Sequence, residues 1–303
     1  MYMKFLEKQP QKDFVILSLT DIHLMDEHWE GKEPENYRIF DVTVRSLIER
    51  VKPNLITITG DISMAGQMTA YHRFGEYIEQ FGIPWAVTWG NHDQEHGIHA
   101  VGPVLECYRN CPHFLYEDGD PQLGNGNYLI GITEGDKLLH TLFMVDSHSY
   151  ATMDGKQVYD KLWPQQMEWY RVQAEAIRQR GCNHSTMLMH MPIYAYNDAW
   201  NAVQAGKCRV EFGVCNEEVC SYPLEDGVFS VLHALGVTQT VIVGHDHVNS
   251  FGVRYQGILL AYGLKTGKPS YSRPELNGGT VLTVKADGST DVRHEYVDVN
   301  HLL

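Results

Sequence analysis

The chain has 303 residues, of which 43% are hydrophobic and 20% charged, and its formal net charge is −14 at pH 7. This composition is typical of a globular protein whose core is large enough to need no disulfide bonds. The acidic balance argues against a non-specific nucleic-acid or membrane binder, because such proteins usually present a basic face.

The sequence shows no signal peptide and no apolar run long enough to cross a bilayer. Its six cysteines form no CxxC pair, which argues against a zinc knuckle or a thioredoxin-like motif. We therefore expect a soluble, cytoplasmic protein without a membrane span or a nucleic-acid surface, unless an export signal has been removed.

Strand-like and helix-like segments alternate in the first half of the chain. Short apolar runs rich in β-branched residues predict strands over 14–19, 55–59 and 85–89, and helical periodicity predicts helices over 37–51 and 67–80. This alternation is typical of βαβ units and predicts a parallel or mixed sheet.

The second half contains more strand-like runs and one clear helix, over 164–180. The strands are predicted over 128–132, 141–145, 186–189 and 240–243. After Gly244 the runs are shorter and separated by glycine-containing turns, which predicts antiparallel strands that close a second sheet, over 251–255, 258–262, 280–284 and 292–297.

No internal repeat, low-complexity tract or linker divides the chain, so we expect a single domain over 1–303. Residues 196–222 have little periodicity and contain three cysteines. They are predicted to be a long insertion or a lid loop.

Five polar clusters each follow an apolar run. In open α/β sheets, ligand sites form at the carboxyl ends of the strands, so side chains from these clusters should converge. Carboxylate, amide and imidazole groups without thiolates suit manganese, iron or zinc. A single cluster would be read as a turn or a cap, but together they predict a dinuclear metal site; they are Asp21-Ile22-His23, Gly60-Asp61, Gly90-Asn91-His92-Asp93, His190 and Gly244-His245-Asp246-His247.

The order DxH, GD, GNHD, H and GHDH over residues 21–247 resembles the calcineurin-like metallophosphoesterases. Residues 244–251 and 262–267 are most similar to the branch related to purple acid phosphatases. The resemblance implies an α/β fold, a four-layer αββα sandwich of two mixed β-sheets flanked by helices. It also implies a metal-dependent phosphoesterase that hydrolyses a phosphomonoester by attack of a hydroxide bridging two metal ions.

The resemblance assigns seven ligands and one catalytic histidine. It implies that Asp61 is shared between two divalent or trivalent ions, manganese, iron or zinc. His92 would steady the developing charge or protonate the leaving oxygen without binding metal. The first ion would be held by Asp21, His23 and His247, and the second by Asn91, His190 and His245.

Two differences from related branches narrow the branch of the family that the chain resembles. Residues 62–65 lack the metal-binding tyrosine of purple acid phosphatases, so their tyrosine–iron colour is not expected. Residues 60–66 also lack the Asp-Arg pair of the protein serine/threonine phosphatases.

Further residues are candidates for supporting the site. Asp93 and Asp246 would either fix histidine tautomers or be ordinary loop acids. Asp146 could reach the pocket or orient His190. His96 and His99 could line the pocket, and the other histidines, His140 among them, are expected at the surface or around the ligands. Four more residues are candidate substrate contacts: Tyr194, Tyr196, Trp200 and Lys265.

Two alternatives remain beside the phosphomonoesterase. One is a phosphodiesterase acting on a nucleotide or a lipid headgroup, and the other is a catalytically silent metal-binding scaffold with a protein partner. We expect a small phosphorylated substrate. Substrate choice depends on loops that follow no readable pattern, and the sequence indicates neither the metals nor the oligomeric state.

Overall fold

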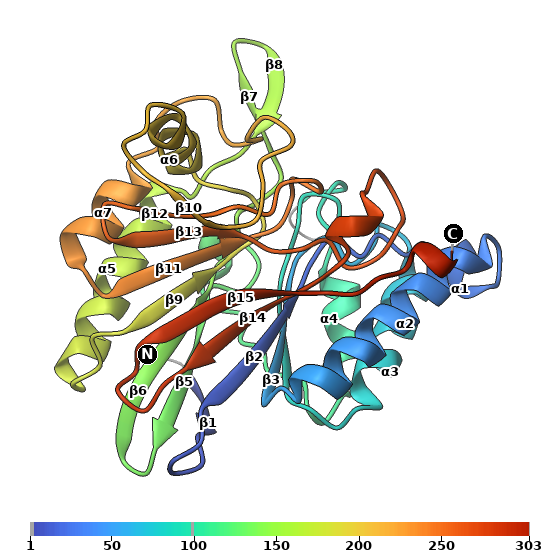
Figure 1. The fold of residues 1–303 in the computed structure, drawn as a ribbon, viewed down its shortest axis with the longest axis horizontal. Coiled ribbons are helices and arrows are strands. Elements are labelled where there is room, and N and C mark those ends of the chain that lie inside the picture. The colour runs from blue at the N-terminus through green and yellow to red at the C-terminus, as the bar shows by residue number, and fades with distance from the viewer. Residues whose placement is uncertain (1–2, 98–99, 303) are drawn as a thin grey trace.

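The computed structural model describes residues 3–97 and 100–302. Two β-sheets pack face to face, and helices cover the outer face of each sheet (Figure 1). The expected four-layer αββα arrangement is thereby confirmed. His99 lies outside the described residues.

The smaller sheet has five strands in the order β15-β14-β2-β3-β4. The three strands predicted from the first half of the chain lie parallel at one side of it, and two antiparallel strands from the end of the chain complete it. These strands are β2 (Phe14–Leu19), β3 (Leu55–Thr59), β4 (Trp85–Thr88), β14 (Gly278–Val284) and β15 (Thr290–Tyr296).

The larger sheet has eight strands in the order β1-β5-β6-β9-β11-β13-β12-β10. Its central strands, from β6 to β13, run parallel to one another. Its members are β1 (Met3–Glu7), β5 (Tyr128–Glu134), β6 (Lys137–Met144), β9 (Ser185–Leu188), β10 (Val210–Phe212), β11 (Thr238–Val243), β12 (Gly252–Tyr255) and β13 (Ile258–Tyr262).

The expectation about the strands after Gly244 is only partly correct. They form antiparallel pairs, as expected, but they do not all close one sheet: β12 and β13 extend the larger sheet, with β13 parallel to β11, while β14 and β15 join β2. Residues 196–222, predicted to be an insertion or a lid loop, contain most of α6 (Ala195–Gln204) and all of β10. Short apolar runs reveal strands but not their partners, because the partner depends on contacts distant in sequence.

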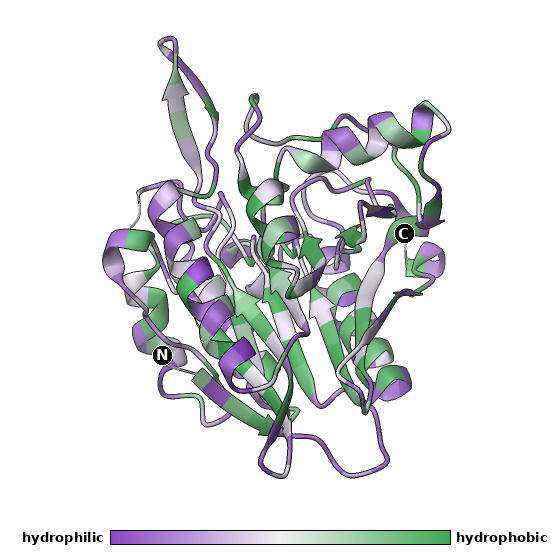
Figure 2. Ribbon diagram, turned by 90° about the vertical axis from the view of Figure 1, so that its left-hand side faces the viewer, coloured by the Kyte–Doolittle hydropathy of each residue, from purple (hydrophilic) through white to green (hydrophobic). Residues whose placement is uncertain are grey.

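Alternation along the strands divides the core into layers. In β2, Ile16 faces the other sheet and Leu17 faces the helices. In β11, Ile242 likewise faces the other sheet and Val241 faces the helices. The strands between the helical layers are accordingly the most hydrophobic part of the molecule (Figure 2). The helices are α1 (Asp26–Trp29), α2 (Pro34–Val51), α3 (Met68–Glu79) and α4 (Gly102–Tyr108) on the side of the smaller sheet, and α5 (Pro164–Gln179), α6 and α7 (Val228–Leu235) on the side of the larger one.

A two-stranded hairpin stands apart from both sheets. Its strands are β7 (Tyr150–Met153) and β8 (Lys156–Tyr159), and it projects beyond the sandwich above the carboxyl ends of the larger sheet (Figure 1). Three short 3-10 helices complete the described structure, Pro121–Leu123, Pro274–Leu276 and Asn300–Leu302. Of the helices in the described ranges, none is both long and apolar enough to cross a membrane.

His140 lies in the interior rather than at the surface or around the ligands, so that expectation is wrong for this residue. Its side chain on β6 is 1% exposed, and Nδ1 lies 2.9 Å from the carbonyl oxygen of Gly288, in the turn between β14 and β15. Nε2 lies 3.0 Å from Thr186 Oγ1. The imidazole therefore joins the two sheets. Burial lowers its pKa from 6.5 to about 4, against the opposing effect of the Gly288 carbonyl.

This burial predicts that acid destabilises the protein through His140. The unfolded chain takes up a proton near pH 6.5 and the folded chain only near pH 4, so stability is lost as pH falls between these values. For His140→Gln, the drop in unfolding free energy from pH 7 to pH 5 should be smaller than in the wild type by about 2 kcal/mol. Urea unfolding of the metal-free protein measures it. The control His72→Gln, at an exposed position of α3, should keep the full drop, and an equal drop in His140→Gln would contradict the assignment.

Candidate metal centre

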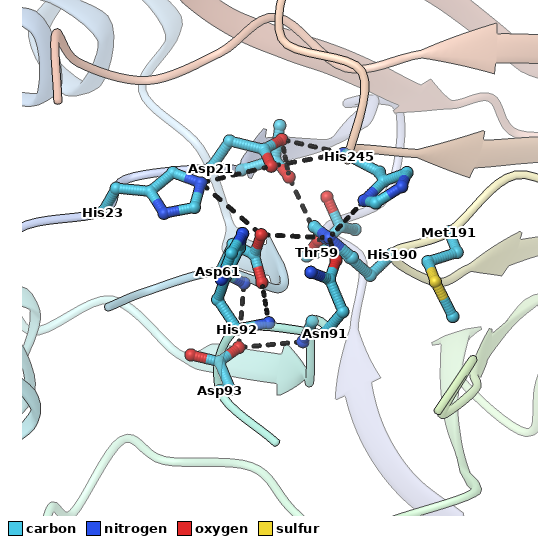
Figure 3. Close-up of polar contacts among 12 residues, drawn as sticks. Asp21, His23, Thr59, Asp61, Asn91, His92, Asp93, His190, Met191 and His245 are labelled. Carbon is cyan, nitrogen blue, oxygen red and sulfur yellow. Dashed lines mark hydrogen bonds and ion pairs between the residues drawn. The ribbon is translucent and has the colours of Figure 1, made fainter. Parts of the chain in front are cut away.

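The five polar clusters meet at the carboxyl ends of parallel strands from both sheets (Figure 3). Each cluster begins within three residues of its strand end, so the sheets position it rigidly. Asp21 and His23 follow β2, Asp61 follows β3, Asn91 and His92 follow β4, His190 follows β9, and His245 and His247 follow β11.

One group of donor atoms surrounds the DxH motif. One ligand atom from each of Asp21, His23, Asp61 and His247 lies within 4.8 Å of all the others, and all four residues are buried. Nε2 of His23 is 3.0 Å from Nε2 of His247 and 3.4 Å from Oδ2 of Asp61. Nε2 of His247 is 3.4 Å from Oδ1 of Asp21. The set of two carboxylates and two imidazoles fits a divalent or trivalent transition-metal ion.

A second group surrounds His190. Its Nε2 lies 3.0 Å from Oδ1 of Asn91, 3.2 Å from Oδ2 of Asp61 and 3.3 Å from Nδ1 of His245. Oδ2 of Asp61 is therefore close to donor atoms of both groups. The structure thus brings together all seven residues that the sequence singled out as ligands.

Main-chain carbonyls orient two of the imidazoles. Nδ1 of His190 lies 2.8 Å from the carbonyl oxygen of Thr59, and Nδ1 of His247 lies 2.9 Å from that of Tyr271. A carbonyl only accepts, so in the neutral rings these Nδ1 atoms carry the hydrogen and each Nε2 presents a lone pair to the cluster. The tautomers follow from this hydrogen-bond network. These carbonyls, and not Asp93 or Asp246, therefore fix the tautomers of His190 and His247.

The resulting cluster brings several lone pairs together in a buried environment. Nε2 of His190, Oδ1 of Asn91 and Oδ2 of Asp61 all point at one another, and acceptors in such an arrangement need a proton or a cation between them. Nε2 of His245 is buried without a hydrogen-bond partner. This donor chemistry fits metal ions, and neutral side chains alone would leave it uncompensated.

The titration behaviour reflects the same concentration of negative charge. Burial opposes ionisation of Asp21, but hydrogen bonds from His23 and His247 hold its pKa well below the usual range. Burial alone would lower the pKa of His190, but the charge of Asp61 raises it to about 10. The carboxylates therefore draw positive charge into the cluster.

The backbone is strained where it presents the candidate ligands. Asp21, His23, Asp61 and His245 all have φ between 53° and 76°, the left-handed region that residues other than glycine rarely adopt. At Gly90 a Cβ atom would overlap Oδ1 of Asp61. Gly90 is thus needed because Asp61 lies directly against its main chain.

Asp93 holds this strained backbone in place. Its buried carboxylate accepts hydrogen bonds from the backbone N–H groups of Asp61 and Gly90, both at 2.8 Å, and of Ile62 at 3.1 Å. The hydroxyl of Tyr71 donates a further one at 2.7 Å. Burial and the nearby charge of Asp61 raise the pKa of Asp93 to about 6. Asp93 therefore acts on the loops that carry Asp61 and Asn91.

Lys265 lies behind the centre. Its side chain is 3% exposed, and Nζ donates to the carbonyl oxygen of Asp21 at 2.6 Å. Burial lowers its pKa to about 8, while the charges of Asp21 and Asp61 oppose this shift. Lys265 thus fixes the main chain of Asp21, a candidate ligand. Tyr196, another candidate substrate contact, is fully buried, and its hydroxyl donates to the carbonyls of Val241 and Ala261.

His92 lies beside the donor atoms and outside them. Its side chain is 30% exposed, and its ring centroid is 5.2 Å from that of His23. Nδ1 lies 2.6 Å from Oε1 of Glu95, while the backbone N–H of His92 donates to Oδ1 of Asp61 at 3.0 Å. This position suits a group that meets the substrate.

The other expected supporting residues have different surroundings. Asp146 accepts from Gln94 Nε2 and from the backbone of Asn125 and His148, and so organises the loops below the hairpin. The side chain of His96 is exposed and lies beside Gly66. Oδ2 of Asp246 accepts from the hydroxyl of Tyr262 and the backbone N–H of Cys220.

Sequence reasoning missed three residues at this site. Tyr150, on the hairpin, accepts a hydrogen bond from Nδ2 of Asn91 at 3.2 Å and so orients the amide oxygen toward His190. The ring of Tyr271 stacks on His247 with centroids 4.2 Å apart. Glu95, three residues after His92, could have been found from that spacing. The tyrosines had no comparable signal, because they lie far from the motifs in sequence.

The fold and this buried cluster define an α/β protein with a candidate metal centre at its strand ends. A family model described as calcineurin-like phosphoesterase matches residues 14–249, and the chain belongs to that family. Membership indicates a phosphoric ester hydrolase that acts on phosphorylated substrates.

Comparisons with individual proteins agree with this family. The chain is 26% identical over 299 residues to the protein named probable inactive purple acid phosphatase 28 of Arabidopsis thaliana, covering 86% of this chain and 72% of that protein. It is 22% identical over 290 residues to a protein of Synechococcus sp. named as a probable cyclic nucleotide phosphodiesterase, covering 95% of this chain and 94% of that one. The fold is similar to the crystal structure of a dimetal phosphatase from Danio rerio, with a TM-score of 0.58, 12% identity, and coverage of 93% and 95% of the two chains.

The contacts of Asp93 predict that Asp93→Asn weakens metal binding. An amide has one acceptor oxygen in place of two and would set its NH₂ group against backbone N–H groups, so Asp61 would lose its support. We expect manganese affinity to fall roughly 10- to 100-fold and the unfolding free energy by about 1–3 kcal/mol. Calorimetric titration and urea unfolding measure these two quantities.

Asp136→Asn is the matched control, since Asp136 is exposed in the turn between β5 and β6. This variant should bind manganese like the wild type. Wild-type affinity in Asp93→Asn would show that the carboxylate does not hold Asp61.

Proposed function

We propose that this chain is a metal-dependent phosphomonoesterase. The observation that carries the proposal is the convergence of buried acceptors on His190 and His247 at the ends of strands from both sheets, with His92 beside them. The single domain over 1–303 would serve this one centre.

Two metal ions would be held by the two donor groups described above. Asp21, His23 and His247 would hold one ion, Asn91, His190 and His245 the other, and Oδ2 of Asp61 would serve both. When bound, such ions supply a water-derived nucleophile at neutral pH and neutralise charge on the phosphoryl oxygens. Manganese, iron and zinc all suit the donor set.

His92 would act on the leaving group. Its ring is partly exposed beside the donor cluster, and the carboxylate of Glu95 contacts Nδ1, which leaves Nε2 to face the substrate. A protonated Nε2 could give its proton to the departing alkoxide oxygen or steady the charge on a phosphoryl oxygen. Glu95 would orient the ring.

The proposal predicts metal-dependent release of phosphate. The purified full chain loaded with manganese or iron should hydrolyse p-nitrophenyl phosphate faster than bis-p-nitrophenyl phosphate, because two bound cations would attract a dianionic monoester more strongly than a monoanionic diester. Chelation with EDTA should abolish turnover, which absorbance of p-nitrophenolate reports.

Faster turnover of the diester would favour the alternative of a phosphodiesterase, which the relative from Synechococcus sp. supports by its name. If a broad panel of phosphate esters released neither phosphate nor alcohol from the loaded protein, the proposal would be wrong. A protein with both metals bound, no turnover and a stable binding partner would be the silent scaffold, the class suggested by the Arabidopsis relative named as inactive.

The placement of His92 predicts that His92→Ala retains its metals and loses turnover. The expected loss in kcat is roughly 100- to 10,000-fold, the usual contribution of a general acid. Metal content by mass spectrometry should stay at the wild-type value, since the His92 ring lies outside the donor groups. His72→Ala, on the exposed face of α3, should leave both quantities unchanged. Loss of one metal equivalent in His92→Ala would make His92 a ligand.

A further inference from the structure

A pocket of about 330 Å³ adjoins the proposed metal centre. It lies between the loop that carries His92 and the β7–β8 hairpin, and its volume is at the small end of the roughly 300–1,000 Å³ usual for ligand sites. The lining residues that the argument uses are Glu95, Ser149, Tyr150, Gln157, Asp160 and Trp163.

Three contacts connect this pocket to the residues expected to do the chemistry. Glu95 contacts Nδ1 of His92 at 2.6 Å. The hydroxyl of Tyr150 accepts from Nδ2 of Asn91 at 3.2 Å, and Oγ of Ser149 donates to the carbonyl oxygen of Asn91 at 3.0 Å. In the proposed function His92 would protonate the leaving oxygen, and the group attached to that oxygen would then extend into this pocket.

The charged groups lining the pocket are both carboxylates, Glu95 and Asp160, and no lysine or arginine of the described chain lines it. Asp160 accepts from the backbone N–H of Lys161 at 2.8 Å and from Nε1 of Trp163 at 3.0 Å. Both donors are neutral, so neither supplies a counter-charge to the Asp160 carboxylate. The ammonium group of Lys161 lies over the ring of Tyr222, 4.4 Å from its centroid, and so turns away from Asp160.

Two aromatic side chains are held rigidly in the pocket wall. Trp163 stacks on His148 with ring centroids 3.8 Å apart and an interplanar angle of 12°. Tyr150 stacks on Tyr159 at 5.7 Å, and Tyr159 packs edge-on against the metal-ligand candidate His245 at 4.4 Å. Aromatic faces combined with carboxylates favour an ammonium group, through cation–π attraction and charge pairing.

We propose that this pocket selects a small cationic alcohol, such as an amino alcohol or a quaternary ammonium alcohol, as the leaving group of the substrate. The inference rests on the proposed function, because it assigns the part of the ester beyond the phosphorus. A leaving group that carries a second phosphate or a carboxylate would be disfavoured, because its negative charge would face Glu95 and Asp160.

The test uses two probes of the same shape that differ in charge. Choline is cationic, and 3,3-dimethyl-1-butanol replaces its nitrogen with carbon. On the metal-loaded full chain, ligand-detected NMR should show choline binding more tightly than its neutral isostere, and kcat/KM should be higher for phosphocholine than for 3,3-dimethylbutyl phosphate. We expect both ratios to be roughly tenfold.

Two substitutions should bring these ratios toward one. Asp160→Asn removes a charge and keeps an oxygen for Trp163, and Gln157→Lys adds a cation at an exposed position of the hairpin that lines the pocket. Gln179→Lys is the matched control, since it adds the same charge at the exposed end of α5, and it should keep the wild-type ratios.

The outcomes distinguish a failure of the proposed cation selection from a failure of the proposed hydrolysis. Ratios at or below one in the wild type, or equal ratios in Gln157→Lys and Gln179→Lys, would overturn the proposed selection of a cation even if p-nitrophenyl phosphate is hydrolysed. Preferential binding of choline without hydrolysis of any ester would support the pocket and overturn the proposed function.

Discussion

The shared position of the Asp61 carboxylate is the constraint on which the rest of the site depends. Oδ2 lies 3.4 Å from Nε2 of His23 and 3.2 Å from Nε2 of His190, so one oxygen is close to both donor groups. Such proximity requires a main chain in the left-handed region, a neighbouring Gly90 without a Cβ atom, and the buried carboxylate of Asp93 to hold the turn. Conformational strain is thus concentrated where the candidate ligands are presented, and the surrounding hydrogen bonds offset its cost.

The architecture explains why five distant segments can form one centre. Each sheet alone brings only part of the donor set to its edge: Asp61 comes from the smaller sheet and His190 from the larger one. Packing of the sheets through Ile16, Ile242 and their neighbours brings the two edges together. Donor atoms supported by strand ends and backbone hydrogen bonds are preorganised, which reduces the cost of ordering them around an ion.

Much of the fold, and the convergence of the candidate ligands, could be predicted from the sequence for a physical reason. Strands buried on both faces, such as β3, appear in the sequence as apolar runs, and the candidate ligands directly after them appear as polar clusters. The sequence did not reveal which sheet β12 and β13 join, or that Tyr150 orients Asn91, because both depend on contacts between distant segments. Nor did the sequence reveal whether Asp93 and Asp246 fix histidine tautomers, because a carboxylate next to a candidate ligand in sequence need not point at an imidazole.

The most direct test of the account is the anomalous scattering of crystals soaked with manganese. The account predicts two strong anomalous peaks, one among Asp21, His23 and His247 and one among Asn91, His190 and His245, with Asp61 between them. A single peak, or peaks only outside this cluster, would contradict a dinuclear centre at the ends of these strands.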